Sequence, residues 1–221
     1  MHRIRVWDLP TRLFHWTLAL AVLGLVVTAN LGGNWMIWHM RLGYGVFALL
    51  LFRFVWGFAG GYWSRFARFV YNPVQLLRYL RGSGDETHEI GHSPLGALSV
   101  FALLIALSAQ VGTGLFSDDE IAFYGPLVSL ASGETISLFT WYHKNVGKPM
   151  LIGLVVLHIL AVLYYRFVKR RNLVTAMIVG DKLLRHHAYS SADGVRERLL
   201  AAIVLALCIT AVWWVIGLGA T

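Results

Sequence analysis

The sequence predicts an all-α integral membrane protein, in which a bundle of four transmembrane helices is followed by a fifth transmembrane helix at the C-terminus. The 221-residue chain is 57% hydrophobic and only 14% charged, with a mean hydropathy of +0.63, which excludes an ordinary soluble domain. A membrane-spanning helix needs about 20 predominantly apolar residues. Five stretches satisfy this requirement: residues 13–31, 39–58, 95–116, 150–168 and 199–218.

The charged residues are distributed unevenly among the segments that connect these stretches. Arginine and lysine gather before the first stretch, between the second and third, and between the fourth and fifth, whereas residues 29–38 carry no charge. Residues 117–142 contain no lysine or arginine but four acidic residues: Asp118, Asp119, Glu120 and Glu134. This positive-inside pattern predicts a multi-pass protein of the bacterial cytoplasmic (inner) membrane with a cytoplasmic N-terminus. The net charge of +8 then reflects loops near anionic membrane lipid, and no nucleic-acid partner is expected.

Four histidines lie in or beside the apolar stretches, at positions that predict two pairs. His15 is near the start of the first stretch, His39 opens the second, and His143 and His158 belong to the fourth, 15 residues apart. That separation is about 22 Å and close to four turns of an α-helix. Because successive spans run in opposite directions, His15 should meet His158 near the cytoplasmic face, and His39 should meet His143 near the outer face. A single interfacial histidine can simply be a polar residue of the aromatic belt, but His158 lies in an entirely apolar stretch, where a lone imidazole is costly.

Two imidazoles from different helices at one depth are the axial ligands that a b-type haem needs. The only cysteine is Cys208, so the sequence has no C-x-x-C-H motif for covalent haem and no thiolate set for an iron–sulfur cluster. We therefore predict two non-covalent haem b groups, each with two histidine ligands. Haem propionates need cationic or hydrogen-bonding partners, and the candidates are Arg12, Arg41, Arg53, Lys144 and Lys148. For Arg53, snorkelling to the interface is an equally good interpretation.

A further motif, His88-Glu89-Ile90-Gly91-His92, matches the H-E-x-x-H signature of zinc metalloproteases. That chemistry requires both histidines on one continuous helix. Gly91 lies inside the motif, and Pro94 marks the first turn of the next span, so the motif should precede that helix and a metalloprotease is not expected. We predict instead that His92 contacts a quinone or a propionate, unless it is only a polar residue at a helix start.

Three segments resemble a known family: VWDLPTRLFHW at residues 6–16, GHSPLG at 91–96 and NLVTAMIVGDK at 172–182. They are similar to bacterial cytochrome b561-type proteins, including the b-type subunits of nickel–iron hydrogenases. The resemblance implies a di-haem four-helix core that exchanges electrons between the membrane quinone pool and a partner, with a ligand pattern that coincides with the two histidine pairs. Two departures are Lys144, where the family often has glutamate, and the fifth span, which lies outside the shared core.

Together these observations predict a di-haem transmembrane core over residues 1–182, followed by a polar loop and an additional helix over residues 183–221. The predicted function is transmembrane electron transfer between quinone, as substrate, and a redox partner on the outer face, such as a c-type cytochrome or another redox subunit. Whether the chain is a quinone-linked oxidoreductase or the cytochrome b subunit of one is left open, as is its oligomeric state. The alternative is a membrane structural or transporter subunit whose histidines bind metal or no cofactor. We also expect residues 63–80 to form one interfacial amphipathic helix.

Overall fold

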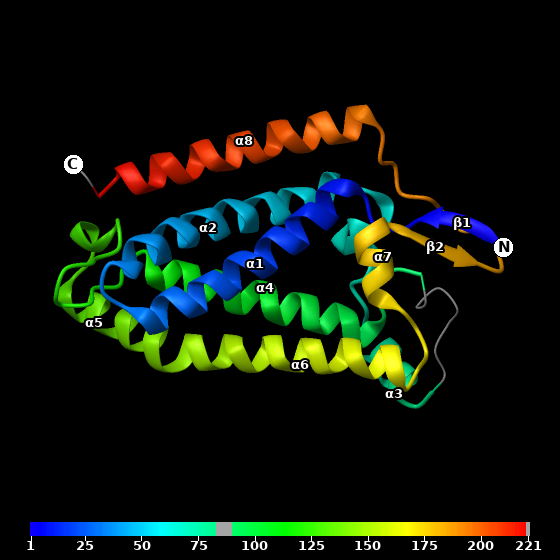
Figure 1. The fold of residues 1–221 in the computed structure, drawn as a ribbon, viewed down its shortest axis with the longest axis horizontal. Coiled ribbons are helices and arrows are strands. Elements are labelled where there is room, and N and C mark those ends of the chain that lie inside the picture. The colour runs from blue at the N-terminus through cyan, green and yellow to red at the C-terminus, as the bar shows by residue number, and fades with distance from the viewer. Residues whose placement is uncertain (83–89, 220–221) are drawn as a thin grey trace. The chain divides into compact units, whose positions relative to one another are not determined.

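The computed structural model describes residues 1–82 and 90–219, and helices dominate this part of the chain (Figure 1). Its five candidate membrane spans confirm the prediction of a multi-pass helical membrane protein. They contain the long helices α1 (Leu9–Leu31), α2 (Trp35–Ala59), α4 (Pro94–Gly114), α6 (Lys148–Phe167) and α8 (Val195–Gly217).

The first helices begin earlier than their apolar stretches suggest. α1 begins at Leu9, because the carboxylate of Asp8 accepts a hydrogen bond from the backbone N–H of Thr11 at 2.7 Å and so caps the helix. α2 begins at Trp35, which places His39 in the second turn instead of at the helix start. α4 begins at Pro94, as predicted.

The fourth span is longer and less regular than predicted. The short helix α5 (Gly133–Tyr142), a π-helical turn (His143–Gly147) and α6 form one continuous helical run. Part of the region expected to be a loop is therefore helical, and the Ser132 hydroxyl caps its start by accepting from the Thr135 N–H. The π-helical turn begins at His143, so the assumption of a regular α-helix around this residue is wrong.

The amphipathic segment is interrupted, unlike the single helix that we expected. Two 3₁₀ turns (Tyr62–Ser64 and Phe66–Arg68) precede the short helix α3 (Pro73–Leu80). Asn72 and Gln75 form a capping box at the start of α3.

The chain divides into two compact units. The first unit contains Met1–Phe14, Arg53–Ala102 and Val155–Ala202, and the second contains His15–Phe52, Leu103–Leu154 and Ile203–Thr221.

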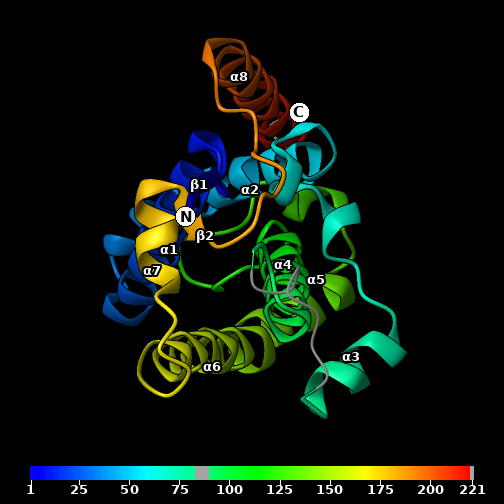
Figure 2. The same ribbon diagram turned by 90° about the vertical axis from the view of Figure 1, so that its right-hand side faces the viewer.

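The first unit contains a small antiparallel sheet that the sequence did not suggest. Strand β1 (His2–Arg5) pairs with strand β2 (Asp181–Leu184), and helix α7 (Leu173–Val179) directly precedes β2 (Figures 1 and 2). Gly180 makes the turn between α7 and β2 at a φ of +90°, a conformation that favours glycine. The buried residues beside the sheet are Ile4, Val6, Trp7, Ile90 and Ala176.

The second unit is built from segments of the long helices. Its buried apolar side chains include Val46 and Leu50 on α2, Leu107 on α4 and Leu151 on α6. Large apolar side chains also face outward along these helices, among them Leu20, Ile105 and Trp213. Such exposure is expected where the solvent is hydrocarbon.

Candidate haem-binding site

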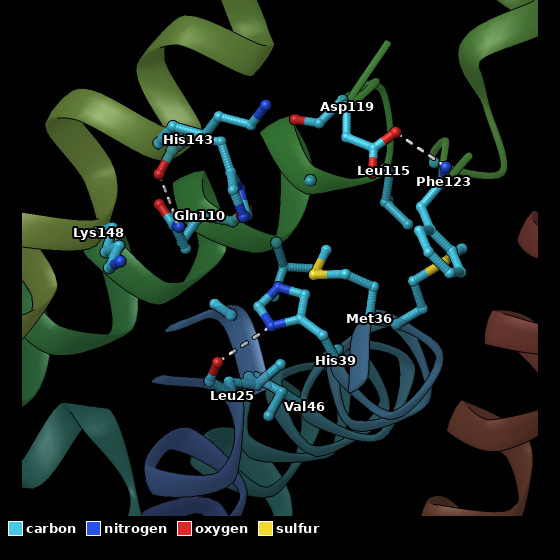
Figure 3. Close-up of a pocket in the computed structure, with 18 of the residues that line it drawn as sticks. Leu25, Met36, His39, Val46, Gln110, Leu115, Asp119, Phe123, His143 and Lys148 are labelled. Atoms are coloured by element: carbon cyan, nitrogen blue, oxygen red, sulfur yellow. Dashed lines mark hydrogen bonds between the residues drawn. The ribbon is translucent and has the colours of Figure 1, made fainter. Parts of the chain in front are cut away.

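The second unit contains a partly open cavity of about 600 Å³, within the usual range of cofactor pockets, about 300–1,000 Å³. Its walls come from α1, α2 and α4 and from the helical run that contains His143. The segment between α4 and α5 lies at one side of the cavity (Figure 3). A pocket between helices of a bundle is a common place for a cofactor in an all-α protein.

His39 and His143 both line this cavity, and their rings point toward one another (Figure 3). The ring centroids are 6.2 Å apart and the ring planes are inclined by 84°. The structure therefore brings together the two histidines that the sequence paired near the outer face.

The distance between the two rings fits a shared metal ion. A metal–imidazole bond is about 2 Å long, and the ligating nitrogen lies about 1 Å from its ring centroid, so two imidazoles on opposite sides of one iron have centroids about 6 Å apart. A directly stacked aromatic pair can show a similar distance, about 4.5–7 Å. The hydrogen bonds of the two rings are those expected of metal-ligating imidazoles.

Each imidazole is bound through Nδ1 to a backbone carbonyl. His39 Nδ1 is 3.0 Å from the carbonyl oxygen of Leu25, and His143 Nδ1 is 2.9 Å from that of Gln110. Because a carbonyl oxygen can only accept, Nδ1 must carry the hydrogen in both rings, which leaves the Nε2 lone pair for a metal. This is the usual outer hydrogen bond of a metal-ligating histidine.

The backbone around His143 is shaped to bring its ring into the cavity. His143 opens the π-helical turn, a feature that often marks functional sites. The side-chain amide of Gln110 donates to the His143 carbonyl oxygen at 3.0 Å, which ties this turn to α4. A Cβ atom on Gly114 would lie 2.9 Å from His143 Cε1, so glycine at this position leaves room for the imidazole.

Two of the proposed cationic partners line the same cavity, namely Lys144 and Lys148. The Lys148 ammonium donates to the side chain of Asn30 at 2.9 Å. Arg41 lies elsewhere, with its guanidinium 5.2 Å from the ring centroid of Trp38, and it is not among the lining residues.

Acidic side chains complete the lining of the cavity at Asp118 and Asp119. The backbone N–H of Phe123, followed by those of Ala122 and Ile121, donates to the Asp119 carboxylate and holds its pKa below the usual value. Asp119 is therefore charged at neutral pH. The two lysines supply the positive charge that an anionic group in this cavity would need.

The first unit holds most of the remaining candidate residues. The Nδ1 atom of His158 is 3.3 Å from the Ser99 hydroxyl. The buried Arg53 guanidinium donates to the Ser64 carbonyl oxygen at 3.1 Å, and its Nη1 atom has no hydrogen-bond partner in the described part of the chain. Arg12 donates to the Ile178 carbonyl oxygen at 2.6 Å.

His92 lies in the loop before α4, with its ring centroid 4.7 Å from that of Trp7 and 4.3 Å from that of Phe69. His88 and Glu89, the other polar residues of the H-E-x-x-H motif, lie outside the described residues. His15 belongs to the second unit, where its ring packs against that of Trp16 with centroids 5.0 Å apart. Its pairing with His158, which belongs to the first unit, stays a prediction.

Several residues of the site were not suggested by the sequence. Leu25 and Gln110 act through their backbone carbonyls, which any residue type could provide. Gln110 and Thr28 did carry a usable signal, because each is a polar side chain inside a long apolar stretch.

Most of the chain resembles known b-type cytochromes. A family model described as prokaryotic cytochrome b561 matches residues 6–180. The chain is 25% identical to a "probable Ni/Fe-hydrogenase B-type cytochrome subunit" of Azotobacter chroococcum, over 82% of this chain and 89% of the relative. It is 26% identical to a protein of the same name from Cupriavidus necator, over 81% and 87%. No solved structure matches the chain significantly. Because the family match spans most of the sequence, this chain belongs to the prokaryotic cytochrome b561 family, and is a multi-pass membrane protein that binds haem b and transfers electrons.

Proposed function

We propose that the chain carries two haem b groups and exchanges electrons between the membrane quinone pool and a redox partner protein. One haem is held by His39 and His143, and the other by His15 and His158. The observation that carries the proposal is the arrangement of His39 and His143, whose rings lie 6.2 Å apart in a cavity of the second unit. A haem bound there supplies a reversible one-electron couple of the iron.

The residues around the cavity suit such a group. The carbonyls of Leu25 and Gln110 orient the two imidazoles, and Lys144 and Lys148 offer positive charge to propionates. In the first unit, Arg53 is only 3% exposed and has a buried guanidinium nitrogen without a hydrogen-bond partner in the described residues. We propose Arg53, together with Arg12, as the propionate partners of the second haem.

The two faces of the membrane suit different reaction partners. The basic segments support a cytoplasmic position for the N-terminus and for the loops of the first unit, in a bacterial inner membrane. There His92, between the rings of Trp7 and Phe69, gives a polar group in an aromatic surrounding that suits a quinone.

The outer face carries Asp118, Asp119, Glu120 and Glu134, which favour a partner with a basic surface. A c-type cytochrome has that chemistry. The names of the relatives point to a nickel–iron hydrogenase as the other choice, and the subunit that co-purifies with the chain would identify the partner.

Haem content of single-histidine variants tests the ligand assignment. A pyridine haemochrome assay of the purified protein should find two extractable haems per chain. His39→Ala and His143→Ala should remove the same haem, and His158→Ala should remove the other. A haem content near zero, or loss of different haems from His39→Ala and His143→Ala, would contradict the proposal.

Quinone kinetics in proteoliposomes test the assigned face. His92→Ala should slow the reaction with a water-insoluble quinone analogue while both haem spectra persist. His186→Ala, which replaces an exposed histidine outside the helices, is the matched control and should leave the rate unchanged. Unchanged kinetics in His92→Ala, with loss of activity on substitution of the acidic segment, would place quinone on the outer face.

A further inference from the structure

The two histidines of the cavity are accompanied by two threonines in the same arrangement. The Thr28 hydroxyl on α1 lies 3.4 Å from His39 Nδ1, and the Thr113 hydroxyl on α4 lies 3.4 Å from His143 Nδ1. His39 also donates to the Leu25 carbonyl oxygen, and His143 to that of Gln110. In each case this carbonyl belongs to the residue three positions before the threonine. The same pair of a threonine hydroxyl and a backbone carbonyl therefore occurs twice, once on α1 and once on α4. Neither helix contains His39 or His143.

The direction of each hydroxyl hydrogen follows from the distances. Thr28 Oγ1 is 2.7 Å from the Gly24 carbonyl oxygen and 3.2 Å from that of Leu25. Thr113 Oγ1 is likewise 2.7 Å from the Ala109 carbonyl oxygen and 3.2 Å from that of Gln110. The shorter bond takes the hydrogen in both cases. The hydroxyl oxygen thus turns its lone pairs toward Nδ1–H and acts as a second, longer acceptor.

We infer that Thr28 and Thr113 are positioning residues for the haem of this cavity, which fix the plane and the tautomer of His39 and His143 and thereby lower its reduction potential. The inference rests on the proposed function, because it requires these histidines to be the ligands. Each threonine shares the Nδ1–H of one ring with a carbonyl, and two acceptors define the ring plane better than one.

The hydrogen bonds at Nδ1 should change the reduction potential in one direction. A stronger acceptor at Nδ1 increases the electron density at Nε2 and makes the imidazole a more basic ligand. A more basic axial ligand stabilises the oxidised iron relative to the reduced iron. Loss of either hydroxyl should therefore raise the reduction potential.

Replacement by valine tests this inference, because valine keeps the shape and removes the hydroxyl. In Thr28→Val and Thr113→Val, we expect redox titration to show a higher midpoint potential for the haem that His39→Ala removes. The expected increase is up to about 59 mV, which corresponds to a tenfold change in the ratio of the oxidation states. Retention of this haem in competition with apomyoglobin should weaken by about tenfold. Thr28→Ser and Thr113→Ser keep the hydroxyl and should behave as the unsubstituted protein.

Thr210 provides a matched control for loss of the hydrogen bond between a threonine hydroxyl and the carbonyl four residues earlier in its own helix. Its hydroxyl donates to the Ala206 carbonyl oxygen at 3.0 Å on α8, and it does not line the cavity. Thr210→Val should leave both potentials unchanged. If the valine variants of Thr28 and Thr113 match Thr210→Val, the positioning role is refuted while the ligand assignment stands. If His39→Ala and His143→Ala retain both haems, the proposed function itself fails.

Discussion

The carboxylate of Asp8 accepts a hydrogen bond from the indole N–H of Trp56 at 3.1 Å, and both side chains are buried. The same carboxylate accepts from the backbone N–H groups of Thr11 and Gly61 and from the Ser64 hydroxyl. One buried anion therefore joins the first turn of α1 to the C-terminal part of α2 and to the turn that follows it.

Removal of this carboxylate should destabilise the protein strongly. Asp8→Ala leaves several buried donors without an acceptor, and each such group costs about 1–3 kcal/mol. We expect the free energy of unfolding to fall by about 3 kcal/mol or more, measured by thermal unfolding in detergent, with Asp8→Asn intermediate. The exposed residue Glu134 supplies the control, since Glu134→Gln should change stability little. Equal stability of Asp8→Ala and the unsubstituted protein would show that these hydrogen bonds are not essential.

Gly114 should be required for binding of the haem for which we propose His143 as a ligand. An added Cβ at Gly114 would lie 2.9 Å from His143 Cε1 and 3.2 Å from Nδ1, so the imidazole must move. We expect Gly114→Ala to lower the content of this haem, as measured by absorbance at constant protein concentration, while the other haem remains.

The control for this substitution lies two residues earlier on the same helix. A Cβ at Gly112 would have no neighbour within 4 Å among the residues that the structure describes, so Gly112→Ala should retain both haems and gain about 1 kcal/mol of helix propensity at most. Similar haem loss in both variants would mean that helix propensity, and not the fit against His143, determines the result.

The sequence predicted those features of the fold that depend on local apolar composition. A stretch of about 20 apolar residues has few alternatives to a transmembrane helix, and all five helices were found. The sequence also paired His39 with His143. Because successive spans run in opposite directions, the position of each histidine along its span sets its depth in the membrane. The short strands β1 and β2 could not be predicted, since four residues carry little periodicity and their partners are 182 residues apart at His2 and Leu184.

Other parts of the site depend on tertiary contacts that leave no trace in residue type. The π-helical turn at His143 widens the helix by one residue locally, and nothing in the sequence His-Lys-Asn-Val-Gly requires it. The acceptors of the two imidazoles are backbone carbonyls, which every residue possesses. Side-chain chemistry thus suggested the two histidines that we propose as ligands, but not the groups that orient them.

Asp193 should make the stability of the first unit sensitive to acid. Burial alone would raise the pKa of Asp193, but the hydrogen bond from the Leu9 N–H and the guanidinium groups of Arg198 and Arg5 outweigh this effect and hold its pKa below the usual 3.8. The Arg5 guanidinium is 2.6 Å from the carboxylate. Since the folded state binds this proton less readily than the unfolded state, the contribution of Asp193 to stability is present above pH 3.8 and is lost as the pH falls through the folded-state pKa.

The difference between the unsubstituted protein and Asp193→Asn isolates this contribution. At neutral pH the variant should unfold at a lower temperature, and the difference in Tm should shrink as the pH is lowered below about 4. The same comparison with Glu120→Gln, which changes an exposed residue, should show no such trend. A difference in Tm that is independent of pH would mean that the charge of Asp193 contributes nothing.

The orientation of His39 and His143 predicts a spectroscopic signature. Their ring planes are inclined by 84°, so two axial imidazoles in this arrangement would donate to different d orbitals of the iron. Those orbitals then remain close in energy, which gives a highly anisotropic low-spin signal, whereas parallel imidazoles give a rhombic one. We expect electron paramagnetic resonance of the oxidised protein to show a highly anisotropic signal that disappears in both His39→Ala and His143→Ala and persists in His158→Ala. If the signal lost in the first two variants is rhombic, the rings must rotate when haem binds, and the hydrogen bonds to Leu25 and Gln110 would not hold the ring planes seen here.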